Sequence, residues 1–416
     1  MPSPKLSSKL ILLGSLYISQ LMPFWFLSEA LPVLLRQQGL PLEALGLLPL
    51  VAIASIFKFL WAPLIDRYSI QRWGHYRFWI ITFQAIVMLI TFACSALSLD
   101  EHLPLILLSL FLLGIGCASQ DIATDALALQ LLRPEERGVG NAVQGVGGSI
   151  GKMIGGGGML IMLNRWGWKL SLIALAILML IALLPLLLFD ESRDVRATPK
   201  EISSFGLNEY LDIFRGFYRQ PNAKLWLVII ALYAAAHSLS FTMFRPLLVD
   251  LELSISEIGS LLGILGTGMT MIGASIAGVI ISRWGRRRSL LIASTLALLG
   301  ILTYFLPTFG YSQLWVLRVI VGVVFLSLGA IGTTSFTIMM DKSRFETAGT
   351  DYTLQTSFIA IGGIIAAAFS GILANQIGYR GVFSSSALLL IACIILIAKY
   401  FQPTVYKCSA DSDLRF

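Results

Sequence analysis

Runs of apolar residues long enough to cross a lipid bilayer recur along almost the whole chain. A membrane-spanning helix needs about 20 mostly apolar residues in a row, and this sequence of 416 residues offers a long series of such segments. Only 13% of the residues are charged, against roughly 25% in soluble domains. Because so few charges cannot cover a water-facing surface of this size, the sequence predicts an all-helical integral membrane protein.

The apolar segments form two groups of six, separated by the longest polar stretch, which runs from Asp190 to about Lys224. We therefore predict twelve transmembrane helices in two pseudo-symmetric six-helix bundles, over residues 1–189 and 224–402, with a linker over 190–223 and a tail over 403–416. The expected spans are 10–35, 43–65, 77–99, 103–131, 138–163, 167–189, 224–249, 256–282, 289–308, 311–340, 349–376 and 380–402.

The basic residues indicate the orientation. With both termini in the cytoplasm, 22 Lys and Arg residues fall on the cytoplasmic side and four on the other side, which agrees with the positive-inside rule. The net charge of +7 is spread over these short loops, so it marks orientation and predicts no nucleic-acid partner. We expect a multi-pass protein of the bacterial inner membrane, a monomer in contact with lipid, whose first apolar segment is a retained helix.

The two halves of the sequence repeat. Gln144 and Gln355 each open a glycine-containing segment, and they are 211 residues apart. The pairs Gly151/Gly362, Gly167/Gly378 and Lys169/Arg380 have the same separation. Glycine-rich membrane helices can resemble each other by composition alone, but a constant offset across several residue types favours duplicated halves, the architecture of alternating-access carriers.

Two loops carry a basic cluster, and in the first of them an acid, Asp66, precedes it. After the second and eighth spans they resemble the Gly-x-x-x-Asp-Arg-x-Gly-Arg-Arg signature of major facilitator carriers, in which a carboxylate and a guanidinium act as a reversible latch at a helix end. Ala62 replaces the leading glycine of the first copy, and Ser282 replaces the acid of the second, so the second latch should be the weaker one. The predicted latch residues are Asp66, Arg67, Arg77, Arg283 and Arg287.

Two carboxylates lie inside the fourth span. Asp121 and Asp125 are four residues apart and therefore share a helix face. Charges inside a membrane are costly, so both should face a wet cavity or a basic partner, and Lys58 and Lys152 are the cations of this half. We predict proton coupling through Asp121, Asp125 and Glu29, and the alternative is a purely structural pair.

In the major facilitator pattern, the first, fourth, seventh and tenth helices line the central path. Aromatic and polar residues recur at steps of three and four on the first and seventh spans, which favours a planar, anionic ligand. Many membrane aromatics only pack or anchor at the interface, and a lone histidine is often structural. The predicted binding residues are Tyr17, Gln20, Trp25, Glu29, Lys152, Tyr233, His237, Phe241, Phe244, Arg245 and Arg318.

Two sequence stretches resemble the AmpG-like permeases. They are Ile56–Tyr68, with Lys58 and Asp66, and Ala118–Ala126, followed by Pro134-Glu-Glu-Arg-Gly138. The group includes muropeptide permeases, acetyl-coenzyme A transporters and the RhtX/FptX-type siderophore permeases, and the twelve-span length resembles the siderophore branch. The resemblance implies proton-driven import of an iron-siderophore chelate by alternating access.

Three other functions stay open at this point. A muropeptide or other amphiphilic-solute permease is the alternative within transport, and a receptor or scaffold is the alternative outside it. An enzyme is not expected, because the sequence has no histidine cluster or nucleophile motif. The four cysteines, Cys94, Cys117, Cys393 and Cys408, have no paired spacing. We therefore predict no disulfide framework, no metal site and no cofactor.

Overall fold

The computed structural model describes residues 5–37, 53–68, 74–98, 101–191 and 206–402, and every regular element in these ranges is a helix. Nine of the described helical segments are long and apolar enough to cross a membrane. Two of them, Arg137–Leu187 and Ala348–Tyr400, contain 51 and 53 residues, about twice what one crossing needs. With the second helix, described over residues 53–67, these segments account for the twelve predicted crossings.

Both of the long segments bend back at a glycine. Gly167 has a φ of 72° inside α9 (Met159–Leu187), and Gly378 has a φ of 67° inside α18 (Ala348–Tyr400). A residue with a Cβ atom is strained at such φ values, and glycine is not. These are the two glycines that the sequence repeat aligns, so the two halves make the same turn at the same place.

The N-terminal bundle comprises the helices of residues 5–191. Its fourth crossing, α7 (Leu103–Leu131), has the predicted bounds. The other helices are α1 (Leu6–Trp25), η1 (Phe26–Ala30) and α2 (Leu31–Gln37), then α4 (Ile53–Phe57), η3 (Lys58–Leu60) and α5 (Ala62–Arg67), then α6 (His75–Ser95), α8 (Arg137–Lys152), η5 (Met153–Gly158) and α9.

The C-terminal bundle comprises the crossings of residues 223–402. Its helices are α12 (Ala223–Asp250), α13 (Ile255–Ile258), η6 (Gly259–Leu265), α14 (Gly266–Trp284), α15 (Arg286–Thr303), α16 (Phe305–Thr308), α17 (Leu314–Lys342) and α18. In the sequence between the bundles, residues 192–205 of the predicted linker lie outside the described residues, as does the predicted tail, 403–416.

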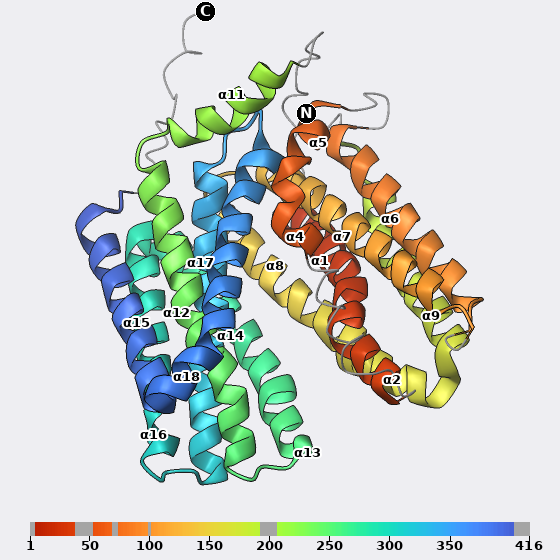
Figure 1. The fold of residues 1–416 in the computed structure, drawn as a ribbon. Coiled ribbons are helices and arrows are strands. Elements are labelled where there is room, and N and C mark those ends of the chain that lie inside the picture. The colour runs from red at the N-terminus through yellow and green to blue at the C-terminus, as the bar shows by residue number, and fades with distance from the viewer. Residues whose placement is uncertain (1–4, 38–52, 69–73, 99–100, 192–205, 403–416) are drawn as a thin grey trace, which may run out of the picture.

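One helix of the linker was not predicted from the sequence. Residues Leu207–Tyr218 form α11, which lies across one end of the molecule, and we call this end the linker end (Figure 1). Phe217 of α11 is fully buried, and Phe214 packs edge-on against Phe59 of the N-terminal bundle. The stretch is polar in composition because only one face of the helix is apolar, so the sequence analysis assigned it to a linker.

The two bundles approach each other most closely at the linker end, where α1 and α18 begin, and they separate toward the far end, where α2 and α13 lie (Figure 1). Between them, α8 packs along α14 and α17, while α5 and α7 contact α18. Helices that are distant in sequence therefore form the boundary between the bundles, as rocking of one bundle against the other requires.

Glycines allow the backbones of α14 and α17 to touch. A Cβ atom at Gly329 would lie 2.0 Å from the carbonyl oxygen of Thr270, and one at Gly273 would lie 2.0 Å from that of Leu326. Small residues at helix crossings in membranes permit this close packing, which supplies the van der Waals contact that holds the helices together.

We predict that Gly329→Ala destabilises the protein, because the new methyl group must force α14 and α17 apart. Overpacking of this kind costs about 1–3 kcal/mol. The matched variant is Gly322→Ala on the same helix, where the nearest atom would be 3.9 Å away and where alanine should improve helix propensity by up to about 1 kcal/mol. Thermal unfolding in detergent measures both, and equal melting temperatures would contradict the prediction.

Candidate functional site

A cavity of about 400 Å³ lies between the two bundles. We call it the central cavity. Its polar side chains from the N-terminal bundle are Tyr17, Gln20, Lys58, Asp121, Asp125, Gln144, Ser149 and Lys152, and those from the C-terminal bundle are Thr267, Thr270, Tyr352 and Thr356. All the charged side chains thus come from one bundle, whereas the opposite wall offers only neutral polar groups and apolar ones.

The first charged group in this cavity is an ion pair between two helices. The Nζ atom of Lys58, in η3, contacts one carboxylate oxygen of Asp121, in α7. Gln20 of α1 donates a hydrogen bond of 2.7 Å to the other oxygen. Lys58 is only 4% exposed, so pairing is what makes its burial tolerable. The sequence named Lys58 and Lys152 as the cations available to the two carboxylates of α7, without predicting which lysine pairs with which acid.

Asp125 lies one turn further along α7 and has a different environment. It is 2% exposed, accepts a hydrogen bond of 2.8 Å from the Tyr17 hydroxyl, and accepts a longer one of 3.4 Å from Gln144. Among the described residues, no Lys, Arg or His forms an ion pair with it. Lys58 and Asp121 cancel each other, so Asp125 leaves this buried group with one uncompensated negative charge when it is ionised.

A second ion pair joins α1 to α8 where both helices widen into π-helical turns. Glu29, in η1, lies 2.9 Å from Lys152, the last residue of α8 before η5, and the Lys152 ammonium stands 4.4 Å from the centre of the Trp25 ring. Such π-turns recur at functional sites in helices. The sequence predicted that Glu29, Lys152 and Trp25 share the path, and the structure brings the three together.

Exposure of the acidic side chains rises toward the far end. Asp125 is 2% exposed, the Asp121 side chain is 28% exposed, and the Glu29 side chain is 36% exposed. The acidic side chains of this half are therefore least exposed toward the linker end.

A row of aromatic rings runs along α12, which contributes no side chain to the lining of the central cavity. Of the predicted binding residues in this row, Tyr233 and His237 line a second, larger cavity beside it, and Phe241 and Arg245 line neither cavity. The rings of Tyr233, His237 and Phe241 follow at steps of four residues, and their planes differ by only 9° and 15° between neighbours. Arg245 stands over Phe241 at 5.2 Å. The four residues share one face of α12, as their spacing indicates.

Two other predicted binding residues lie elsewhere. Phe244 is fully buried against Tyr304 inside the C-terminal bundle, with 4.4 Å between the ring centres. Arg318 is exposed on α17 and lines neither the central cavity nor the larger cavity beside α12. Both differ from the expectation because neighbouring residues on a helix point about 100° apart, so a small error in helix phase moves a side chain to another face.

The first latch motif connects the two bundles at the linker end. Asp66 accepts hydrogen bonds from the backbone N–H groups of Gly349 and Thr350, at 2.9 and 2.7 Å, and from the Thr350 hydroxyl, at 2.6 Å. These groups lie at the N-terminus of α18, where a helix offers free N–H donors and a partial positive charge. The Tyr76 hydroxyl adds a fourth hydrogen bond, at 2.8 Å.

The basic latch residues act mostly within their own bundle. Arg77 donates hydrogen bonds to the carbonyl oxygens of Leu186 and Leu187, at the end of α9. Arg67 lies 3.7 Å from Glu209 of α11. In the second copy of the motif, Arg287 donates to the carbonyl oxygen of Ala398, while Arg283 is exposed at the end of α14.

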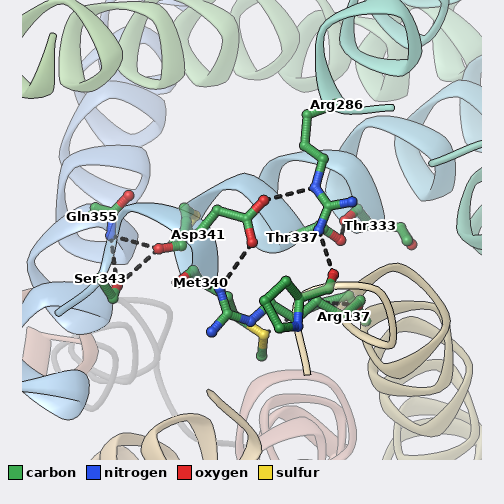
Figure 2. A network of polar contacts seen from close by, with 11 residues as sticks. Arg137, Arg286, Thr333, Thr337, Met340, Asp341, Ser343 and Gln355 are labelled. Carbon is green, nitrogen blue, oxygen red and sulfur yellow. Dashed lines mark hydrogen bonds and ion pairs between the residues drawn. The ribbon is translucent and has the colours of Figure 1, made fainter. Parts of the chain in front are cut away.

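A buried ion network between the bundles was missed from the sequence (Figure 2). Asp341, at the end of α17, accepts a hydrogen bond of 2.9 Å from Arg137 of α8 and one of 2.7 Å from Arg286 of α15. Arg137 also donates to the Met340 carbonyl at 3.2 Å, and Arg286 donates to the carbonyl of Pro134. One carboxylate thus holds two guanidinium groups, one from each bundle.

The sequence contains the residues of this network, but the sequence analysis gave two of them other roles. Arg137 belongs to the Pro-Glu-Glu-Arg-Gly motif, which served as a family marker, and Arg286 was counted as an orientation charge. Asp341 ends an apolar run that carries no other charge from residue 319 onward. An acid at that position needs a partner, and this requirement alone could have drawn attention to it.

Two further contacts reinforce the linker end. Lys9 of α1 lies 2.7 Å from Glu136, just before α8. Burial opposes ionisation of Glu136, but the hydrogen bonds and charges of Lys9 and Arg133 together outweigh it, and the pKa of Glu136 is lowered. Arg344 forms an ion pair of 2.7 Å with Asp351 of α18 and donates to the carbonyl of Ile213 in α11. The linker helix therefore contacts both bundles.

Comparisons with known proteins agree with this architecture. The model of the Major Facilitator Superfamily matches residues 13–367. The anhydromuropeptide permease of Escherichia coli (strain K12) is 26% identical over 92% of this chain and 78% of its own length. Two solved structures share the fold. The human organic anion transporter MFSD10 (TETRAN) has a TM-score of 0.75 and 16% identity over 95% of this chain and all of its own. FucP in the outward conformation has a TM-score of 0.71 and 15% identity over 94% and 98% of the two chains.

These comparisons support part of the expected family resemblance. Relatives of the AmpG type match over most of the chain, as the motifs around Lys58 and Asp121 predicted. None of these three proteins is named as a siderophore permease, so the siderophore branch gains no support from them. With a family model that covers most of its length, a fold of two six-helix bundles and permeases as relatives, the chain belongs to the Major Facilitator Superfamily.

Proposed function

We propose that the protein is an inner-membrane permease of the muropeptide type, which imports an amphiphilic solute from the periplasm by alternating access. The proposal is carried by a charged cavity between two bundles, in a chain that matches an anhydromuropeptide permease over 92% of its length. A receptor or scaffold has no use for intramembrane charges, which are costly to keep. The basic residues favour a cytoplasmic linker end, and the far end, where the bundles separate, would then face the periplasm.

The test is uptake in bacterial cells that lack their own anhydromuropeptide permease. Cells that express this chain should accumulate a labelled anhydromuropeptide, and a proton uncoupler should abolish the accumulation. A panel of radioactive iron-siderophore chelates is offered in parallel. Saturable uptake of a chelate, with none of the anhydromuropeptide, would replace this proposal by the siderophore function that the motifs first implied.

For coupling, Asp125 is the strongest of the three predicted carboxylates, because Asp121 and Glu29 each have a lysine partner. An unpaired carboxylate buried to 98% is costly when ionised, and one proton would neutralise it. Taking up that proton from one side and releasing it on the other would link solute movement to the proton gradient.

We therefore predict that Asp125→Asn loses accumulation but keeps exchange. A permanently neutral side chain cannot carry a proton, yet it preserves the hydrogen bond with the Tyr17 hydroxyl. Proteoliposomes should show no uphill uptake under an imposed proton gradient, while counterflow of labelled against unlabelled solute continues. Glu346→Gln, in an exposed acid of the loop before α18, is the matched control and should leave both unchanged. Full gradient-driven accumulation by Asp125→Asn would contradict the assignment.

A further inference from the structure

A second cavity, of about 470 Å³, lies beside the central cavity and entirely within the C-terminal bundle. We call it the side cavity. Its walls come from α12, α17 and α18, and it shares Leu328 and Phe336 with the central cavity. Both volumes fall within the roughly 300–1,000 Å³ of small-molecule sites. A solute larger than either cavity can therefore occupy both at once, passing Leu328 and Phe336.

The polar groups of the side cavity are all neutral. They are the Tyr233 hydroxyl, the His237 imidazole and the hydroxyls of Ser238 and Ser335, set among aliphatic side chains. The Tyr233 hydroxyl is buried and has no hydrogen-bond partner. No hydrogen bond to the His237 ring is present among the described residues. These two groups are free to bind a ligand, and a buried polar group without a partner is costly until it does.

The chemistry of this cavity fits a sugar ring. A pyranose has an apolar C–H face, which packs against aromatic rings, and a rim of neutral hydroxyl groups, which exchange hydrogen bonds with tyrosine, histidine and serine. The nearly parallel rings of Tyr233 and His237 offer the first kind of contact, and their polar atoms offer the second. An ionised group finds no opposite charge there, since the cavity is lined by no Lys, Arg, Asp or Glu.

The central cavity has the opposite character. Lys58, Lys152 and Asp121 line it, and Glu29 pairs with Lys152. The two lysines can receive carboxylates, while Asp121 and Glu29 can receive an ammonium group. Lys58 is buried, but the side chains of Asp121, Glu29 and Lys152 are partly exposed, so a zwitterionic ligand can exchange with them. Glu29 lies nine residues after Gln20, the hydrogen-bond partner of Asp121, which separates the two pairs by about 13 Å at 1.5 Å per residue. An extended peptide of four residues spans about 13 Å.

We propose that the solute lies across the boundary between the bundles, with its sugar rings in the side cavity against Tyr233 and His237 and its peptide against the ion pairs Lys58–Asp121 and Glu29–Lys152. This binding mode rests on the proposed function, because it assumes a solute that joins a sugar to a peptide. It assigns sugar recognition to the C-terminal bundle and peptide recognition to the N-terminal bundle. Such a solute would bridge both bundles, and its binding would then be sensitive to their relative position.

The test compares three probes on the purified full-length protein: the anhydro-disaccharide alone, its tetrapeptide alone, and the complete disaccharide-tetrapeptide. Tyr233→Phe removes one hydroxyl and keeps the ring. It should weaken binding of the two sugar-containing probes about tenfold, the usual size of one lost hydrogen bond in a buried site, and leave the peptide unaffected. His237→Ala should weaken the same two probes further.

The complementary variant is Glu29→Gln/Lys152→Met, which removes the second ion pair without leaving a charge behind. It should weaken the two peptide-containing probes and leave the disaccharide unaffected. Tyr311→Ala, at an exposed aromatic residue away from both cavities, is the control for general effects, and melting temperatures check that every variant is folded.

Each outcome of these binding measurements supports or overturns the proposed binding mode. Selective losses in the two opposite directions support the binding mode. Equal losses for all probes, or selective losses with the bundles exchanged, overturn it while leaving the proposed function intact. If the wild-type protein binds a long-chain acylated compound in the side cavity and none of the sugar probes, the cavity is a site for an apolar chain. If the wild-type protein neither binds nor transports any of the three probes, the proposed function fails as well.

Discussion

Lys58→Met is expected to abolish uptake and to destabilise the protein. The substitution removes the only ammonium group that contacts Asp121 among the described residues and leaves two carboxylates, at Asp121 and Asp125, one helical turn apart with no counter-charge. Breaking a buried ion pair by removing one partner costs about 3–5 kcal/mol. Asp121 is partly exposed, so we expect a value near the lower end, measured as a fall in the thermal unfolding midpoint in detergent.

The double variant Lys58→Met/Asp121→Asn separates the two effects. With both charges removed, stability should return close to the wild-type value, because replacing a whole buried pair by neutral groups is often tolerated. Uptake should remain absent if the pair takes part in binding or coupling. The control for removing a lysine is Lys224→Met, since Lys224 is exposed at the start of α12. A double variant as unstable as Lys58→Met would refute the pairing as the source of the loss.

The second large effect is expected at the gate, the buried network of Asp341, Arg137 and Arg286. Asp341→Asn removes the charge that holds Arg137 of one bundle and Arg286 of the other (Figure 2). The contact is buried, with Asp341 8% exposed and Arg137 7% exposed. Its loss should favour opening of the linker end by about 2 kcal/mol or more, or roughly thirtyfold in the equilibrium between closed and open states.

A single cysteine at Thr337, in a background without the four natural cysteines, reports this opening. Thr337 is fully buried beside the network, so a membrane-impermeant maleimide should label it slowly unless the linker end opens. Asp341→Asn should accelerate the labelling from that side. Asp212→Asn breaks an exposed pair with Arg215 on α11, which is worth at most about 1 kcal/mol, and should leave the rate unchanged. An unchanged rate in Asp341→Asn would contradict the assignment of this network as the contact that keeps the linker end closed.

The sequence could predict those parts of the fold and the site that depend on residues close together along the chain. The apolar runs, the repeat of Gly167 and Gly378, and the shared face of Asp121 and Asp125 are local features, which a regular helix converts directly into geometry. The structure bears out the twelve-helix fold, and it places Asp121 and Asp125 on the central cavity. Which basic residue pairs with which acid depends on how the helices pack against each other. The residue spacing of a single sequence does not reveal this packing.

The ion network of Asp341 and the aromatic row along α12 illustrate this limit. Asp341 meets Arg137 across 204 residues of sequence, so neither residue marks the other as its partner. Phe244 and Arg245 are neighbours in sequence, yet one is buried in the bundle core while the other lies in the aromatic row. Their assignment to one face required knowing the rotation of α12, which only its tertiary contacts fix.

The matching turns at Gly167 and Gly378 also bear on the history of the chain. After a gene duplication, the two copies can drift wherever a substitution is harmless, and they stay alike where the backbone tolerates only glycine. A positive φ at the hairpin is such a place in both halves, whereas the latch acid survives as Asp66 in one copy and is Ser282 in the other. The two halves thus still make the same turn at a glycine, while only the first half keeps the acid of the motif.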